Sequence, residues 1–143
     1  LIARHDFRID ATILEKSKAQ PQVRSSDPRF YQYAWFYPLQ HVAPQIAGSG
    51  DELFIAAASL GTKKRRNAFR LALHDVVEQR GERARTCTVF WPAASDPCLQ
   101  IADYCTWAIQ RKWERNDLAP YNLVKAKIAS ESDLWVKGTT EYY

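Results

Sequence analysis

The chain has 143 residues, of which 46% are hydrophobic and 25% charged, which is the composition of an ordinary globular protein and predicts one domain over residues 1–143. Its formal net charge of +4 permits an anionic partner such as nucleic acid without requiring one. It has no apolar run long enough to cross a membrane, and its three cysteines lack the spacing of a zinc knuckle or a disulfide framework, so we expect a protein of the reducing cytoplasm.

The chain begins with a strand signal. Apolar and polar side chains alternate from Phe7 to about Lys16, which is the period of a strand. Residues 17–28 are polar and contain two prolines, which predicts a loop. Asp27 followed by Pro28 then predicts the start of a helix.

Aromatic residues mark the predicted helix that follows. Six of them fall between Phe30 and Tyr37; they could stack on nucleic-acid bases, but their helical spacing favours packing in the core. Pro38 and Pro44 must kink or break the helix. The uncharged run from Leu53 to Leu60 is typical of a central strand covered on both faces.

The second half continues this alternation. Residues 64–79 carry an apolar stripe among charged positions, which predicts an amphipathic helix. Residues 86–91 read as a strand that Pro92 ends, and a helix follows from Pro97 to Glu114. The order strand, helix, strand, helix, strand, helix predicts an α/β fold whose sheet is at least partly parallel.

The helix from Pro97 to Glu114 carries the leading functional candidate. Asp96 can cap its first turn. Nearly every position from 98 to 109 is apolar, which predicts a helix packed on most of its surface, with Gln100 and Asp103 on one face. A buried carboxylate needs a partner, which is either a hydrogen bond or salt bridge within the protein, or a divalent cation.

Two further groups of polar residues were candidates for binding. Four consecutive cations at the start of the 64–79 helix could receive a nucleic-acid backbone, although a solvated charge run explains them as well. The three histidines are scattered and show no His–Glu spacing that suggests zinc. The cations are Lys63, Lys64, Arg65 and Arg66, and the histidines are His5, His41 and His74.

The late helix also carries a motif. It reads Leu99-Gln100-Ile101-Ala102-Asp103, which matches the pattern Leu-Gln-x-Ala-Asp, and on these residues the chain resembles a bacterial family known as Domain of Unknown Function 3800. Residues 96–98 and 104–114 resemble one subgroup of that family, and residues 7–18, 54–66 and 142–143 extend the similarity along the chain.

The resemblance implies an RNase H-like fold, with three layers around a mixed sheet. It also implies a first strand with an Asp-Glu motif, whose acid meets the late helical Asp around a divalent cation. No such motif precedes Phe7, so we expect the chain to be N-terminally incomplete and to lack the first two strands of the fold. Where the family's fold places a carboxylate near the end of the fourth strand, this chain has residues 56–59, Ala-Ala-Ala-Ser.

The resemblance, together with the acid in the late helix, implies a divalent-metal-dependent nuclease or related phosphodiesterase that uses Mg²⁺ or Mn²⁺. Asp103 would be the catalytic metal ligand and Gln100 would orient a ligand or substrate, with Asp10 as a second candidate metal ligand. Two-metal chemistry needs several carboxylates. The alternative is therefore a non-catalytic nucleic-acid- or protein-binding module with a degenerate acidic site, and a structural partner subunit is a third possibility.

Overall fold

The computed structural model describes residues 2–48, 50–59 and 85–136, together with seven positions between residues 63 and 78. Those seven positions, all helical, are Lys63, Asn67, Arg70, Leu71, His74, Asp75 and Glu78. In chain order the strands and α-helices are β1 (Ile9–Ile13), α1 (Pro21–Arg24), α2 (Asp27–His41), α3 (Ala43–Ile46), β2 (Glu52–Ala58), β3 (Arg85–Trp91), α5 (Pro97–Arg115), α6 (Leu118–Val124) and β4 (Ile128–Asp133).

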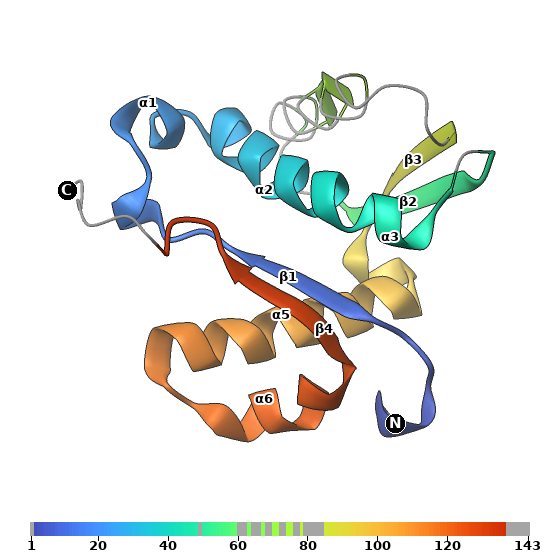
Figure 1. The fold of residues 1–143 in the computed structure, drawn as a ribbon, viewed down its shortest axis with the longest axis vertical. Helices are drawn as coiled ribbons and strands as arrows, with labels where there is room; N and C mark the ends of the chain where they lie inside the picture. Colours follow the sequence, from blue (N-terminus) through green and yellow to red (C-terminus); the bar gives the residue numbers. More distant parts are fainter. Residues whose placement is uncertain are drawn as a thin grey trace.

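The described strands form two parallel pairs (Figure 1). β1 pairs with β4, and β2 pairs with β3 with Ile55 opposite Thr88. The predicted α/β class and parallel pairing are confirmed. The single mixed sheet implied by the resemblance is not observed among the described strands, and β2 has one neighbour there instead of the predicted place in mid-sheet.

The N-terminal helices differ from the prediction in detail. The segment predicted as a loop contains a 3-10 turn at Lys16–Lys18 and the short helix α1, which has Pro21 in its first turn. α2 begins at the predicted place, but its cap is Ser26, whose Oγ accepts a hydrogen bond from the Arg29 amide at 3.3 Å. Pro38 does not break the helix, which continues to His41. Pro44 lies in the first turn of a separate helix, α3.

The first part of the core lies between α2 and the β2–β3 pair. Along β2, Ile55 and Ala57 are buried while Phe54 is 55% exposed. This alternation is typical of a strand covered on one face, so the predicted burial of both faces of the 53–60 run is wrong. Leu39 of α2 packs with Ile55, and the partly buried side chains around them are Trp35, Phe36, Leu53 and Phe90.

The second part of the core positions α5. Cys105 and Ala108 on α5 pack with Val124 of α6, against Ile9 of β1 and Ile128 of β4. The β1–β4 pair consequently lies between α5 and α6 on one side and α2 on the other (Figure 1). None of the described helices is both long and apolar enough to cross a membrane.

Candidate functional site

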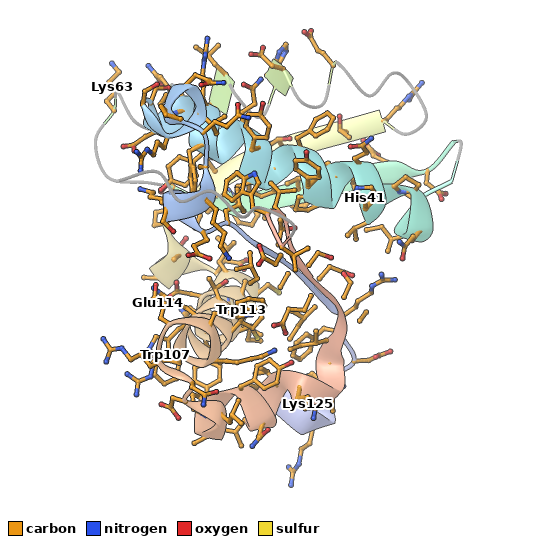
Figure 2. The ribbon with its side chains drawn as sticks, turned by 60° about the vertical axis from the view of Figure 1, so that its left-hand side comes forward. His41, Lys63, Trp107, Trp113, Glu114 and Lys125 are labelled. Atoms are coloured by element: carbon orange, nitrogen blue, oxygen red, sulfur yellow. The ribbon has the colours of Figure 1, made fainter. Side chains whose placement is uncertain are left out.

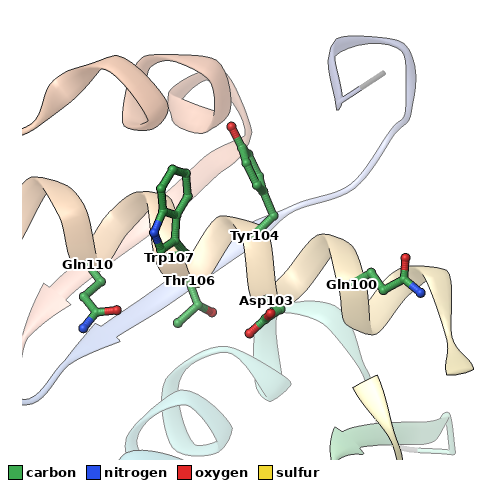
Figure 3. A pocket seen from close by; sticks show the side chains of 6 residues that line it. All are labelled: Gln100, Asp103, Tyr104, Thr106, Trp107 and Gln110. Atoms are coloured by element: carbon green, nitrogen blue, oxygen red, sulfur yellow. The ribbon is translucent and has the colours of Figure 1, made fainter. Parts of the chain in front are cut away.

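The exposed face of α5 forms an open hollow of about 400 Å³. Asp96 caps the first turn of α5, because its Oδ1 accepts a hydrogen bond from the Leu99 amide at 2.9 Å, as the sequence predicted. At the other end the helix stops where Asn116 adopts a left-handed conformation with φ of 52°. The residues lining the hollow are Gln100, Asp103, Tyr104, Thr106, Trp107 and Gln110 (Figure 3).

Asp103 is exposed, so the predicted burial of this residue is wrong. The prediction failed because apolar side chains, whose number predicts burial, also lie on the exposed face of α5, as Ala102 and Trp107 do. The Asp103 carboxylate makes no hydrogen bond or ion pair with any residue that the structure describes. Both oxygens of Asp103 are thus available to a ligand.

Two neutral oxygens lie on the same face of α5. Gln100 Nε2 donates to the Ala94 carbonyl at 3.0 Å, which anchors the amide and leaves Oε1 as a possible acceptor. The Thr106 hydroxyl donates to the Ala102 carbonyl at 2.8 Å and keeps lone pairs that can accept. Asp103 and Thr106 project from the same side of the helix (Figure 3). Together these side chains present only oxygen ligands.

Asp10 lies on β1 in a different environment. Arg8 donates to both Asp10 oxygens, at 2.7 Å and 2.9 Å, and the Ser130 hydroxyl donates at 2.6 Å. Burial alone would raise the pKa of Asp10, but the hydrogen bonds from Arg8 and Ser130 and the Arg8 charge hold that pKa below its usual value. These contacts satisfy the hydrogen-bonding groups of Asp10 without a metal ion, and its role as a metal ligand stays a prediction.

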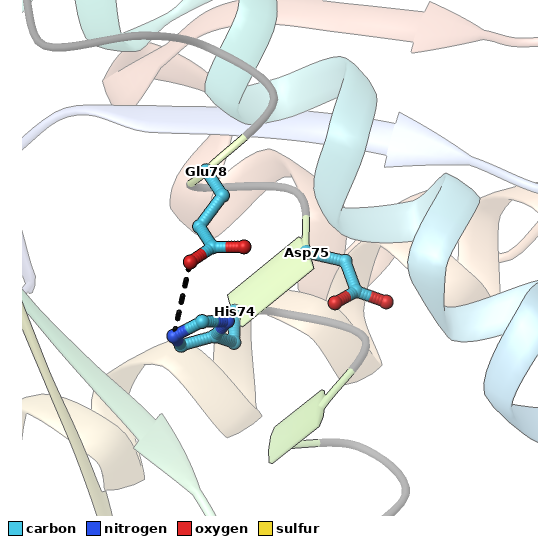
Figure 4. Close-up of side chains that lie close together, drawn as sticks. All are labelled: His74, Asp75 and Glu78. Carbon is cyan, nitrogen blue, oxygen red and sulfur yellow. Dashed lines mark ion pairs between the residues drawn. The ribbon is translucent and has the colours of Figure 1, made fainter.

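Among the described residues, no cluster of acidic side chains surrounds Asp103 or Asp10. Within the described ranges, neither Asp103 nor Asp10 belongs to a group of three or more His, Cys, Asp or Glu ligand atoms lying within 4.8 Å of one another. The group that meets this criterion is His74, Asp75 and Glu78, all exposed, with 3.6 Å between His74 Nε2 and Glu78 Oε1 (Figure 4). This group was not predicted from the sequence, although the four-residue spacing of His74 and Glu78 places both on one helical face.

A second acid missed by sequence reasoning is Glu131 on β4. Its carboxylate accepts hydrogen bonds from Lys112 Nζ at 2.6 Å, Trp113 Nε1 at 2.5 Å and Tyr121 OH at 2.9 Å. Burial alone would raise the pKa of Glu131, but these three donors and the Lys112 charge hold it below its usual value. Because its oxygens are occupied, Glu131 joins α5 and α6 to β4 and does not offer a ligand site.

Of the predicted basic cluster at residues 63–66, the structure describes Lys63. Lys63 is exposed and lies well away from Trp107 and Trp113 of α5 (Figure 2). Lys64, Arg65 and Arg66 lie outside the described residues. Binding of nucleic acid by this cluster therefore stays a prediction, and the exposed face of α5 is a separate candidate surface.

No protein-family model matches this chain, and no curated protein or solved structure is similar to it. The resemblance to Domain of Unknown Function 3800 accordingly stays a prediction from the sequence, based on the motif that ends at Asp103 and on the further segments named above.

Proposed function

We propose that this protein is a divalent-metal-dependent nuclease or related phosphodiesterase, with Asp103 as a ligand of Mg²⁺ or Mn²⁺. The observation that carries the proposal is the carboxylate of Asp103, which lines an open hollow and has no hydrogen-bond or ion-pair partner among the described residues. The Leu-Gln-x-Ala-Asp motif, in which Gln100 and Asp103 are the polar members, supports the same reaction class.

The oxygen donors of the hollow fit a magnesium or manganese ion. Such ions prefer oxygen ligands, and Mg²⁺ usually keeps several waters while one or two protein carboxylates and substrate phosphates complete its coordination. The Asp103 carboxylate and the Gln100 and Thr106 oxygens match that chemistry. One carboxylate fits a single hydrated ion, whereas two-metal hydrolysis would need further acidic ligands.

A bound ion would supply charge stabilisation and an acidic water for attack on a phosphodiester. The protein's own contribution is positional. Asp103 would hold the ion on the rigid second turn of α5, and Gln100, anchored through Nε2 to Ala94, would direct Oε1 toward a metal-bound water or hold the substrate in register. Thr106 would accept a hydrogen bond from a water of the ion's hydration shell.

A non-catalytic nucleic-acid-binding module is the second candidate. It is favoured by the observation that Asp103 lacks neighbouring acids within the described part of the chain. In that case the hollow would bind nucleic acid without cleaving it, and the Asp103 carboxylate would not affect any rate.

Cleavage assays separate these candidates. We expect the purified protein to hydrolyse labelled DNA or RNA, single- or double-stranded, when Mg²⁺ or Mn²⁺ is present, and to stop when the metal is chelated. Replacing a first ligand should cost at least as much as replacing the groups that orient ligands, so Asp103→Asn should lower the rate by about 100-fold or more. Glu114→Gln is the matched control, because Glu114 is an exposed acid of α5 that does not line the hollow, and glutamine keeps the oxygen that accepts a hydrogen bond from Gln110 Nε2.

Equal rates for the wild type and Asp103→Asn would refute the metal-ligand role of Asp103. Binding of nucleic acid without any metal-dependent cleavage would favour the non-catalytic module.

A further inference from the structure

A tryptophan lies one helical turn from Asp103 on α5. Trp107 follows Asp103 by four residues, and both residues line the same hollow, with the indole and the carboxylate projecting to opposite sides of α5 in the view of Figure 3. Trp107 is 46% exposed. Much of the indole therefore faces solvent instead of packing in the core.

Two neighbours hold the indole in place. The Tyr104 ring lies 5.5 Å from the Trp107 ring, centroid to centroid, with 43° between the planes. The Arg111 guanidinium carbon lies 5.9 Å from the centroid of the Trp107 ring, within reach of a cation–π interaction. Arg111 is itself tied to Asp117, with 2.6 Å between Nη2 and Oδ2. An aromatic ring that is already held in place loses little conformational entropy when a flat partner stacks on it.

One cation of α5, Arg115, could meet an anionic chain without breaking an ion pair among the described residues. Beyond Trp107 the helix carries three cations, Arg111, Lys112 and Arg115, and one acid, Glu114. Lys112 is paired with Glu131, whereas Arg115 has no hydrogen bond or ion pair within the described residues. At 1.5 Å per residue, Arg115 lies about 12 Å from Trp107 along the helix axis, so a bound strand could reach both.

We propose that the hollow on α5 binds single-stranded nucleic acid, with one unpaired base stacked on Trp107 and the neighbouring phosphodiester beside Asp103. This inference rests on the proposed function and names the substrate class of that site. Aromatic rings beside cations bind single strands by stacking, because every base has an open π-face once it is unpaired. In a duplex those faces are covered by neighbouring bases, so the indole would find no equivalent partner there.

Fluorescence anisotropy with labelled oligothymidylate, oligouridylate and a duplex of the same length tests this in EDTA. Metal-dependent cleavage is absent there, and Asp103→Asn is measured beside the wild type because an Asp103 carboxylate without a metal ion repels the neighbouring phosphate. We expect the single strands to bind the intact protein more tightly than the duplex. Stacking is worth about 1–3 kcal/mol per base, so Trp107→Ala should weaken single-strand binding by roughly 5- to 140-fold. Trp107→Phe, which retains a ring, should restore most of the affinity.

Trp91→Ala is the matched control, because Trp91 is 38% exposed and does not line the hollow, whereas Trp113, the other exposed tryptophan of α5, donates a hydrogen bond to Glu131. We expect it to bind single strands as the wild type does, with circular dichroism confirming that both alanine variants are folded. Unchanged binding by Trp107→Ala, equal losses in both alanine variants, or equal affinity for the duplex would overturn the inference. Because binding is measured without metal, failure of the cleavage assay alone would refute the proposed reaction and leave the single-strand site supported.

Discussion

The Glu131 carboxylate accepts hydrogen bonds from three side chains, those of Lys112, Trp113 and Tyr121. It is 11% exposed and pairs with Lys112, whose side chain is 29% exposed. Lys112 also lies 4.2 Å from the centroid of the Tyr121 ring, so the acid, the cation and the aromatic ring form one cluster between β4, α5 and α6. Removing one member of such a cluster leaves the others desolvated without a charged partner, which destabilises a protein more than replacing both members of an ion pair by apolar residues.

We expect Glu131→Gln to lower the free energy of unfolding by about 1.5–3 kcal/mol at neutral pH, since hydrogen bonds to a charged group are lost. Urea unfolding measures this. The pKa of Glu131 is lower in the folded protein than its ordinary value of 4.5, so the contribution is present above that pH and is lost as the pH falls through the folded pKa. The difference between the variant and the wild type should therefore shrink in acid.

Glu114→Gln is the control for this substitution, because Glu114 is exposed; it should change stability by less than about 0.5 kcal/mol. A difference between Glu131→Gln and the wild type that stays constant from neutral to acidic pH would contradict the assigned role of the carboxylate.

At the scale of single residues, the sequence predicted Asp103 and Gln100 as candidate site residues but predicted the wrong surroundings for Asp103. Helical periodicity places side chains on a common face, yet exposure depends on which elements cover that face. Glu131 gave no signal at all, because its donors come from residues 10 to 19 positions away. The predicted core packing of the aromatic residues of α2 is confirmed for Trp35 and Phe36. Tyr31 and Tyr33 are instead 38% and 39% exposed.

At the scale of elements, the start of α5 is the feature that local sequence specified best. Asp96 followed by Pro97 predicted the cap, and the hydrogen bond from the Leu99 amide confirms it. Helix α6 and strand β4 were not predicted. β4 reads Ile-Ala-Ser-Glu-Ser-Asp, which is too polar to show the apolar alternation of a typical strand, and its pairing with β1 compensates for that weak propensity.

We expect Asp96→Ala to destabilise the protein by about 1 kcal/mol, because one amide of the first turn of α5 loses its acceptor. Asp96→Asn should retain nearly full stability, since asparagine caps helices as well as aspartate does. Thermal unfolding measures both. The helical turn that carries Gln100 follows this cap directly, so Asp96→Ala should also reduce any metal-dependent cleavage. Equal stability of the alanine and asparagine variants would show that the cap contributes nothing.

At the scale of the whole molecule, the β1–β4 pair brings the two ends of the described chain together. The Ser130 hydroxyl donates to Asp10 across 120 residues at 2.6 Å. The sequence predicted the order of elements and the presence of parallel pairing, but not which strands pair. Local patterns carry no information on such distant partners, and the cost of closing a long loop is recovered only when the core around Cys105 and Val124 forms.

The central claim is that Asp103 binds a divalent cation, and calorimetric titration of Mn²⁺ into the intact protein tests it most directly. We predict saturable binding that Asp103→Asn abolishes or weakens at least tenfold, and that Glu114→Gln and His74→Ala retain. The His74 variant is included because His74, Asp75 and Glu78 also present ligand atoms close together. Identical Mn²⁺ affinity and stoichiometry in the wild type and Asp103→Asn would contradict the account.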